Sequence, residues 1–270
     1  MGLKPSTRIM GILNITPDSF SDGGHFSSPR DALAQADRLI DEGSDILDVG
    51  GESTRPFADP VSIEEELQRV IPVIEGIRNK HSIPISIDTS KAAVAREALQ
   101  AGADIINDIS ALQRDPEMIS LVRQTTVPVI IMHMQGNPAD MQIKPEYRDV
   151  TGDIFDFFKE RIGWIKTEGV ALDRIIIDPG IGFGKNLQHN LSILKNIAKF
   201  SSLELPVLLG HSRKRFLGDI TGVEHEAERD LASAVVSALC CTKGISIVRV
   251  HNVAATRQAL HIADTLHSAS

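Results

Sequence analysis

Residues 83–109, IPISIDTSKAAVAREALQAGADIINDI, contain the pattern that decides the fold. An apolar run over residues 83–87 ends at Asp88, and a segment with helical periodicity follows over residues 91–100. Gly102 comes directly after that segment, and a second apolar run covers residues 105–109. Runs that are apolar at nearly every position are typical of strands buried on both faces, as in a parallel sheet. The segment therefore predicts a strand, a helix and a second strand.

The same alternation extends in both directions along the chain. Eight short apolar runs occur at residues 9–13, 46–49, 83–87, 105–109, 127–132, 175–177, 207–209 and 245–250. Segments with helical periodicity occur at residues 29–41, 63–78, 91–100, 116–123, 153–168, 190–199, 228–241 and 253–266. This alternation predicts an α/β fold, a single (β/α)8 TIM barrel over residues 1–270. An open doubly wound sheet is the alternative, and it would place the site at one switch point.

Capping residues support the predicted helices. Ser62 with Glu65 three positions later forms a capping box, and helices are expected to begin after Ser90, Asp115 and Asn252. Gly43, Gly102 and Gly169 follow helix ends, where a left-handed residue is favoured.

Composition and charge exclude several classes of protein. The net charge of the 270 residues is −8 and no basic stripe is present, so binding to nucleic acid or to an anionic membrane is not expected. No apolar run reaches the ~18 residues of a membrane-spanning helix, and no signal peptide is recognisable at the start. The only two cysteines, Cys240 and Cys241, are adjacent in a predicted helix and are expected to be free thiols. A reducing, cytoplasmic location is therefore expected.

Polar residues follow the apolar runs, where a barrel brings all strand ends to one pocket. Alone, Asp88 is equally explained as a helix cap and His133 as a core histidine. A cap is not needed at every strand end, so the whole set predicts an active site at the C-terminal ends of the strands. Its members are Asn14, Asp48, residues 52–55, Asp88, Asn107, Asp108, His133, Asp178, residues 211–214, Arg249 and His251.

Two kinds of ligand chemistry are represented in this set. Arg55, Lys214, Arg249 and His251 suit a phosphate or diphosphate. Asp88, Asn107 and Asp178 suit a neutral ring that carries several hydrogen-bond donors.

Three loops are candidates for contacts with a ligand. Residues 179–185, PGIGFGK, match neither the Walker pattern nor GxGxxG, and we interpret them as a flexible loop that lets backbone approach a flat ligand. The long polar loops over residues 16–24 and 50–56 are expected to be lids over the barrel mouth.

The sequence closely resembles the dihydropteroate synthases, which are pterin-binding enzymes. The matching blocks run in order over nearly the whole chain. They are residues 10–24, 48–56, 86–89, 106–108, 132–136, 178–185, 212–214 and 249–251.

The resemblance implies a transferase of folate biosynthesis. Such an enzyme condenses 6-hydroxymethyl-7,8-dihydropterin diphosphate with p-aminobenzoate, giving 7,8-dihydropteroate and diphosphate. It implies Mg²⁺ as cofactor, a homodimer, and inhibition by sulfonamides.

The resemblance also implies roles for individual residues. Asn14 would ligate Mg²⁺, while Thr54, Arg249 and His251 would contact the diphosphate. The pterin ring would bind to Asp88, Asn107, Asp178 and Lys214 and pack on Met132, and Pro56 and Phe183 would shape the p-aminobenzoate slot. Phe20, Asp22 and Arg55 would belong to the two lids. The expected catalytic residues are Asn14, Asp22, Arg55 and Lys214.

The chain departs from the family pattern at three positions. Phe57 stands where glycine is expected, His211 where Met or Thr is expected, and Asn252 where Asp is expected. Two rival functions remain open at this point. One is a pterin-binding methyltransferase barrel, which would need a cobalamin partner domain, and the other is a non-catalytic pterin-binding paralogue.

Overall fold

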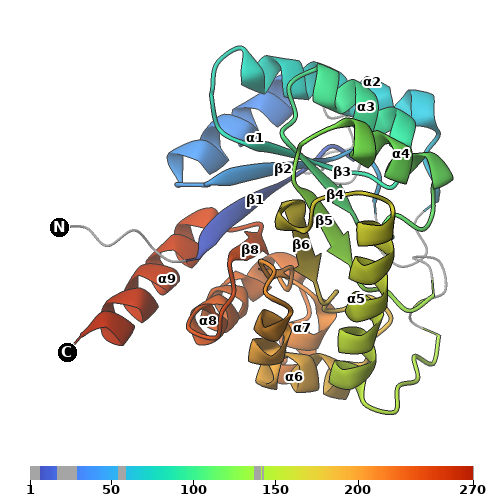
Figure 1. Ribbon diagram of the computed structural model, residues 1–270. Helices are drawn as coiled ribbons and strands as arrows, with labels where there is room; N and C mark the ends of the chain where they lie inside the picture. Colours follow the sequence, from blue (N-terminus) through green and yellow to red (C-terminus); the bar gives the residue numbers. More distant parts are fainter. Residues whose placement is uncertain (1–6, 17–28, 54–58, 137–140, 142, 270) are drawn as a thin grey trace.

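The strands form one ring of eight parallel strands. The computed structural model describes residues 7–16, 29–53, 59–136, 141 and 143–269. The strands follow the order β6-β5-β4-β3-β2-β1-β8-β7, and Figure 1 shows them in the middle of the molecule with helices around them. Their bounds are β1 Arg8–Asn14, β2 Ile46–Gly50, β3 Ile85–Asp88, β4 Ile105–Asp108, β5 Val129–Met132, β6 Ile175–Asp178, β7 Leu208–Leu209 and β8 Ile247–Val250. The predicted TIM barrel is confirmed.

The last neighbours in the ring, β6 and β7, make the weakest seam. They are joined by a single isolated bridge between Ile177 and Val207. One hydrogen bond, from the Ile177 amide to the Pro206 carbonyl at 3.0 Å, accompanies it. Because β7 has only two residues, no regular hydrogen-bond ladder forms between β6 and β7, and the barrel is nearly rather than fully closed.

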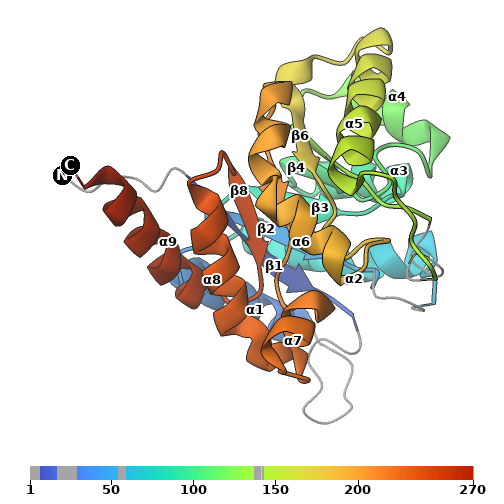
Figure 2. The same ribbon diagram turned by 90° about the horizontal axis from the view of Figure 1, so that it is seen from below.

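Helices connect the strands and cover the outside of the ring (Figures 1 and 2). The α-helices are α1 Pro29–Asp41, α2 Ile63–Arg78, α3 Ala92–Gln100, α4 Pro116–Gln124, α5 Val150–Thr167, α6 Leu187–Lys195, α7 Arg215–Thr221, α8 Asp230–Cys241 and α9 Val253–Ser268. Short 3₁₀ helices occupy η1 Leu172–Arg174, η2 Ile197–Leu203 and η3 Glu226–Arg229.

Most predicted helices match these bounds, with three differences. The helix α7 was not predicted, because it is short and buries only Phe216 and Leu217. The helix α5 begins at Val150, three residues before the predicted start. The segment predicted as one helix over residues 190–199 is divided between α6 and η2.

Helix caps confirm most of the expected starts. The side chains of Ser62, Asp115 and Asn252 accept backbone amides at 3.1, 2.9 and 2.9 Å. The prediction for Ser90 is wrong, because Lys91 is the N-cap of α3 and makes no side-chain cap bond. Asp115, which belongs to the next loop, accepts the Ala92 amide instead at 2.7 Å. The three glycines predicted after helix ends all have positive φ: Gly43, Gly102 and Gly169.

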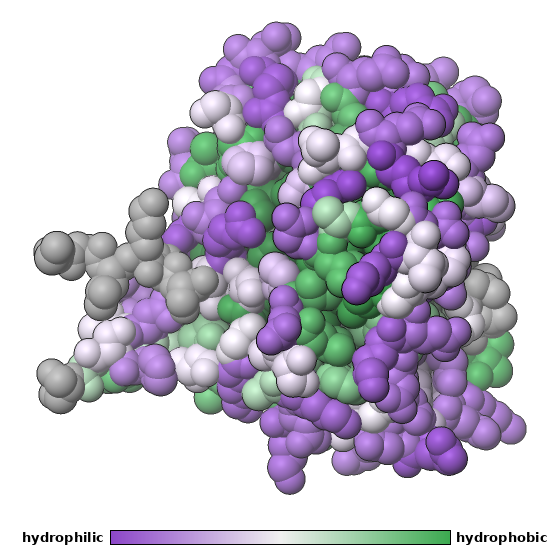
Figure 3. Space-filling model, in the orientation of Figure 1, coloured by the Kyte–Doolittle hydropathy of each residue, from purple (hydrophilic) through white to green (hydrophobic). Residues whose placement is uncertain are grey.

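Two apolar layers hold the barrel together. A large cluster fills the space between strands and helices. A smaller one plugs the barrel interior, and all its members are at most 6% exposed: Met10, Ile46, Ile105, Ile130, Ile176, Leu208 and Ile247. On the face shown in Figure 3, hydrophobic residues gather in the middle and hydrophilic residues surround them. Within the described residues, no helix is long and apolar enough to span a membrane. Cys240 and Cys241 are buried free thiols, as predicted.

Candidate active site

A polar layer lies directly above the interior plug. Side chains of a strand alternate between two faces, so a position two residues beyond a plug residue also faces the barrel interior. Moving two residues along from the plug reaches Asp48 in β2, Asn107 in β4, Asp178 in β6 and Arg249 in β8. Asp88 at the end of β3 pairs in register with Gly50 and Asn107. The sequence thus turns from apolar to polar at the same height on strands around the ring.

Arg249 links three strand ends through two carboxylates. Its Nε donates to Asp48 Oδ2 at 2.6 Å and its Nη2 donates to Asp88 Oδ2 at 2.7 Å. The side-chain amide nitrogen of Asn107 donates to Asp48 at 3.2 Å. Asp48 is fully buried, whereas the side chains of Asp88 and Arg249 are 11% and 21% exposed.

Asp88 and Arg249 affect each other's ionisation. Burial raises the pKa of Asp88, Arg249 opposes this shift, and the nearby Asp48 adds to it, so the resulting pKa is about 7. Burial alone would lower the pKa of Arg249, but Asp48 and Asp88 raise it above its usual value. Arg249 is therefore a permanent cation, and Asp88 changes charge near neutral pH.

Asp178 and Lys214 lie close enough to influence each other's charge. Asp178 Oδ1 accepts the Gly180 amide at 2.8 Å, so the carboxylate does brace the turn after β6. Its Oδ2 lies toward Gly210 on the neighbouring strand end. Burial raises the pKa of Asp178, and Lys214 opposes that shift. Burial lowers the pKa of Lys214 to about 7, although Asp178 pulls it upward.

The loop over residues 180–185 is tightly packed, in contrast to the flexible loop that we interpreted from its glycines. Gly180, Gly182 and Gly184 all have positive φ. A Cβ on Gly180 would lie 1.9 Å from the His133 carbonyl oxygen, and one on Gly184 would lie 2.5 Å from that of Gln135. Glycine is required because the loop lies directly on the segment after β5.

Lys185 holds this loop from inside. It is 3% exposed, and its Nζ lies 2.8 Å from the Phe183 carbonyl oxygen and 3.0 Å from His133 Nδ1. Burial, together with Lys185, lowers the pKa of His133 to about 3, so this histidine is neutral. Above the loop, Lys214 Nζ donates to the Ile181 carbonyl and lies 4.2 Å from the centre of the Phe183 ring.

His251 lies beside the loop that follows β7. Its Nδ1 is 3.0 Å from Ser212 Oγ, and its backbone amide donates to the same oxygen at 3.1 Å. The unexpected residue in this loop, His211, is fully buried, and its Nε2 lies 2.8 Å from the Ser233 carbonyl oxygen and 3.1 Å from Ser237 Oγ. Burial lowers the pKa of His211 to about 4. The departure at position 211 is thus accommodated by α8 rather than directed into the mouth.

The structure brings most of the described candidates together at the mouth. Asp88, Asn107, Met132, Asp178, Phe183, Lys214, Arg249 and His251 lie on strand ends or on the loops after them, and Asn14 ends β1. Phe20, Asp22, Thr54, Arg55, Pro56 and Phe57 lie outside the described residues.

Two residues of this region were not assigned a role from the sequence. Asp48 was noted only as a strand-end residue, and Lys185 only as part of a glycine loop. Their contacts in the folded chain reveal them: Asp48 bonds to Asn107 and Arg249, and Lys185 to His133. The position of Asp48 two residues after the plug residue Ile46 was the one signal available.

Fold and site together define a barrel enzyme whose mouth combines carboxylate and amide acceptors with basic side chains. Residues 10–251 match the family model described as pterin binding enzyme, and the chain belongs to that family. A dihydropteroate synthase from Escherichia coli is 47% identical over 97% of this chain and 92% of its own length. The chain therefore belongs with the dihydropteroate synthases, which are transferases.

Two solved structures agree with this assignment. The Yersinia pestis dihydropteroate synthase with a sulfonamide drug complex has a TM-score of 0.93 and 43% identity, covering 99% of this chain and 97% of that one. The Xanthomonas albilineans dihydropteroate synthase in complex with 7,8-dihydropteroate has a TM-score of 0.89 and 41% identity, covering 98% and 95%.

Proposed function

We propose that this barrel catalyses the condensation of 6-hydroxymethyl-7,8-dihydropterin diphosphate with p-aminobenzoate. The observation that carries the proposal is the polar layer at the mouth, which combines carboxylate and amide acceptors with the half-buried basic side chains of Arg249 and Lys214. Asp178 Oδ2 and the Asn107 carbonyl oxygen accept hydrogen bonds from the amino group and ring N–H groups of the pterin. Lys214 donates to ring acceptors, and Met132, which is 3% exposed, packs on the ring.

The diphosphate is proposed to bind beside the ring, near His251. Thr54 and Arg249 complete this anion set in the proposal. Arg249 is bonded to two carboxylates, so in this proposal it contributes charge to the diphosphate while it continues to hold Asp48 and Asp88.

Mg²⁺ is proposed to reach the site together with diphosphate. Asn14 provides one neutral oxygen, and among the described residues no group of three acidic, histidine or cysteine side chains could hold a metal. Mg²⁺ prefers six oxygen ligands and keeps several waters. The residues present therefore fit a cation whose other ligands are diphosphate oxygens and water. Bound there, it would supply Lewis-acid stabilisation of the leaving group.

The reaction follows from positioning and charge. The arylamine nitrogen lone pair forms a bond to the exocyclic carbon of the pterin as the carbon–oxygen bond to diphosphate breaks. Diphosphate leaves with that electron pair, and the amine loses its extra proton to solvent. Cations near the leaving group stabilise charge that develops in the transition state, and the pocket aligns the two reactants.

A diphosphate-release assay tests the proposal. With Mg²⁺ present, release is expected only when both the pterin diphosphate and p-aminobenzoate are supplied. Methyl transfer from a folate to a corrinoid without dihydropteroate formation would indicate the methyltransferase alternative, and pterin binding without turnover would indicate a non-catalytic paralogue. Sulfonamides are expected to compete with p-aminobenzoate; competition with the pterin diphosphate would contradict the proposed slot beside Phe183.

We also propose that two copies of the chain associate through α8 and α9. These helices lie side by side (Figures 1 and 2), and large apolar residues are exposed on both. On α8 they recur every four positions, which places them on one face. They are Leu231, Val235 and Leu239 on α8, and Ile262 and Leu266 on α9. Patches of this kind on soluble proteins mark interfaces, and a twofold axis would bury the same patch on both copies.

Sedimentation tests the dimer. Leu239→Glu is expected to give a monomer, whereas Ile143→Glu, which changes an exposed apolar residue outside this face, should leave the dimer intact. A monomeric wild-type chain would contradict the proposal. The buried free thiols of Cys240 and Cys241 support the further proposal of a reducing, cytoplasmic location.

A further inference from the structure

The loop after β7 has an unusual conformation at its centre. Arg213, between Ser212 and Lys214, has a φ of 60°, a left-handed value that few non-glycine residues adopt. Its backbone amide donates to Ser233 Oγ at 3.0 Å, and its carbonyl accepts from Arg229 Nη1 at 3.1 Å. The start of α8 therefore holds the backbone in a conformation that the loop would not keep alone.

The side chain of Arg213 is fixed from the same helix. Its Nε and Nη2 donate to the two carboxylate oxygens of Asp230 at 2.6 and 2.8 Å. Such two-pronged pairs fix orientation as well as distance. Asp230 is the first residue of α8, and its side chain is 19% exposed. Burial raises the pKa of Asp230, but hydrogen bonds from Arg213 and Asn252 bring it below its usual value.

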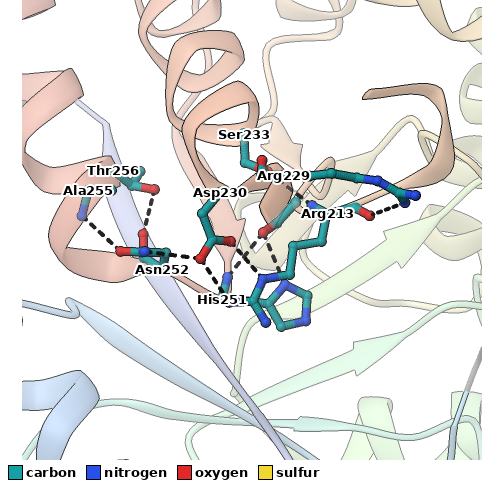
Figure 4. A network of polar contacts seen from close by, with 9 residues as sticks. Arg213, Arg229, Asp230, Ser233, His251, Asn252, Ala255 and Thr256 are labelled. Atoms are coloured by element: carbon teal, nitrogen blue, oxygen red, sulfur yellow. Dashed lines mark hydrogen bonds and ion pairs between the residues drawn. The ribbon is translucent and has the colours of Figure 1, made fainter. Parts of the chain in front are cut away.

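Asp230 also reaches the loop after β8. Asn252 Nδ2 donates to Asp230 Oδ2 at 3.0 Å, while Asn252 Oδ1 caps α9 by accepting the Ala255 amide. Asn252 directly follows His251, which is bonded to Ser212. Figure 4 shows Asp230 between Arg213 on one side and Asn252 on the other. The loops after β7 and β8 are thus tied twice, by Ser212 with His251 and by Asp230 with its two partners.

We propose that Asp230 is a positioning residue for the anion half of the site. Its carboxylate sets the spacing between the loop that carries Ser212 and Lys214 and the loop that carries His251. The inference rests on the proposed function, because it assigns His251 to the diphosphate. Asp230 touches no substrate in this proposal; it acts through Arg213 and Asn252.

The decisive experiment measures how Asp230→Asn changes diphosphate affinity. An effect of charge alone and a positioning role predict changes in opposite directions. Asp230→Asn removes a negative charge near the anion site, which by Coulomb's law alone would tighten diphosphate binding. If Asp230 positions His251, inorganic diphosphate should instead bind about tenfold more weakly, as when the partner that orients a ligand-binding histidine is removed. Affinity for the bare hydroxymethyl pterin should fall less than diphosphate affinity, since Asp88, Asn107 and Asp178 lie on other strands and only Lys214 lies on the loop that Asp230 holds. Calorimetry measures both affinities, and unchanged or tighter diphosphate binding would overturn the proposal.

Matched variants separate this effect from loss of fold. Asp219→Asn removes the same charge from α7, where Asp219 is 41% exposed and 3.7 Å from Arg215, and should leave diphosphate affinity unchanged. If Asp230→Asn does not fold, Arg213→Lys keeps the charge, loses the two-pronged pair, and should show the same selective weakening.

A structural measurement tests the inference independently of catalysis. A crystal structure of Asp230→Asn should show the distance between Ser212 Oγ and His251 Nδ1 lengthened from 3.0 Å. An unchanged distance would overturn the positioning role. If the wild-type chain binds no diphosphate, the proposed function fails, and the positioning role is then decided by this distance alone.

Discussion

The interior of the barrel has two layers that differ completely in chemistry although they come from the same strands. The lower layer is the apolar plug, in which Ile46, Ile105, Ile176 and Ile247 are almost fully buried. The upper layer begins two residues later on the same strands, with the acids and amides of the mouth and Arg249. A shift of two residues along these strands therefore separates the apolar plug from the polar residues of the site. The plug provides a rigid floor, and the polar layer above it is held by that floor rather than by flexible loops.

The two layers also differ in how they tolerate burial. The plug loses nothing by leaving water, whereas a buried charge is costly unless it is paired. The polar layer meets that cost by sharing Arg249 between Asp48 and Asp88. This leaves one acid in excess, which is available to a ligand that carries hydrogen-bond donors.

The largest effect is expected from breaking the upper layer at Arg249. Arg249→Ala leaves two carboxylates without a cation, and we expect a loss of about 3–5 kcal/mol in the free energy of unfolding. Urea denaturation at neutral pH measures it. Arg249→Lys, which keeps the charge, should lose less. A loss below about 1 kcal/mol would mean that Asp48 and Asp88 do not depend on Arg249.

Breaking the lower layer should affect stability but not catalysis. Ile130 is fully buried in the plug, and Ile130→Ala is expected to cost about 2–4 kcal/mol of unfolding free energy. KM for both substrates should stay within about twofold when the variant is assayed well below its Tm. Ile143→Ala, at a residue that is 66% exposed, should change stability by less than about 0.5 kcal/mol. A large rise in KM for Ile130→Ala would show that the two layers are not separable.

A single acceptor in the upper layer should affect ligand affinity selectively. Asp178→Asn keeps the oxygen that accepts the Gly180 amide but presents an NH₂ group to the donors of the pterin ring. We expect about 2–3 kcal/mol weaker binding of the bare hydroxymethyl pterin by calorimetry. Asp173→Asn, at an acid before the opposite end of β6, is the control. If Asp178 only braces the turn, Tm will fall and the affinity will not.

The smallest expected effect is a pH dependence that only the upper layer produces. The pKa of Asp88 rises from its ordinary value of 3.8 to about 7 in the folded chain. The folded state therefore binds this proton more tightly than the unfolded state, and stability falls as pH rises from about 4 to above 7. Because Asp88 is 11% exposed and water reaches the mouth, we expect about 1–2 kcal/mol rather than the full value of the shift.

Comparison with Asp88→Asn isolates this contribution. The stability of wild type relative to the variant should decline between pH 5 and pH 8, as measured by urea denaturation at each pH. A difference that stays constant over this range would contradict the raised pKa of Asp88.

The ring of strands could be predicted because both of its signals are local. Apolar runs mark the buried strands, and the polar residue after each run marks the mouth, so Asp88, Asn107 and Asp178 were found without a structure. The helix α7 could not be found, because seven residues with two buried side chains give no measurable periodicity.

Pairing between distant residues was the part that the sequence could not provide. Nothing local indicates that Asp48 and Asp88 share Arg249, which lies 201 and 161 residues away along the chain. The same holds for Lys185, whose burial depends on His133 in a different loop. Asp230 appears in the sequence only as a helix residue, and its contact with Asn252 depends on how α8 and α9 pack.

The weak seam between β6 and β7 predicts where the barrel opens locally. With one bridge and a two-residue strand, this is where the ring should open first, and amides of Ile177 and its neighbours should exchange with solvent ahead of those in β1 to β4. Asp178 is the last residue of β6, on one side of the seam, and Lys214 lies in the loop after β7, on the other side. A pterin ring that binds to both side chains would connect the two sides of the seam. If the pterin binds as proposed, it should therefore slow amide exchange at this seam more than elsewhere in the barrel.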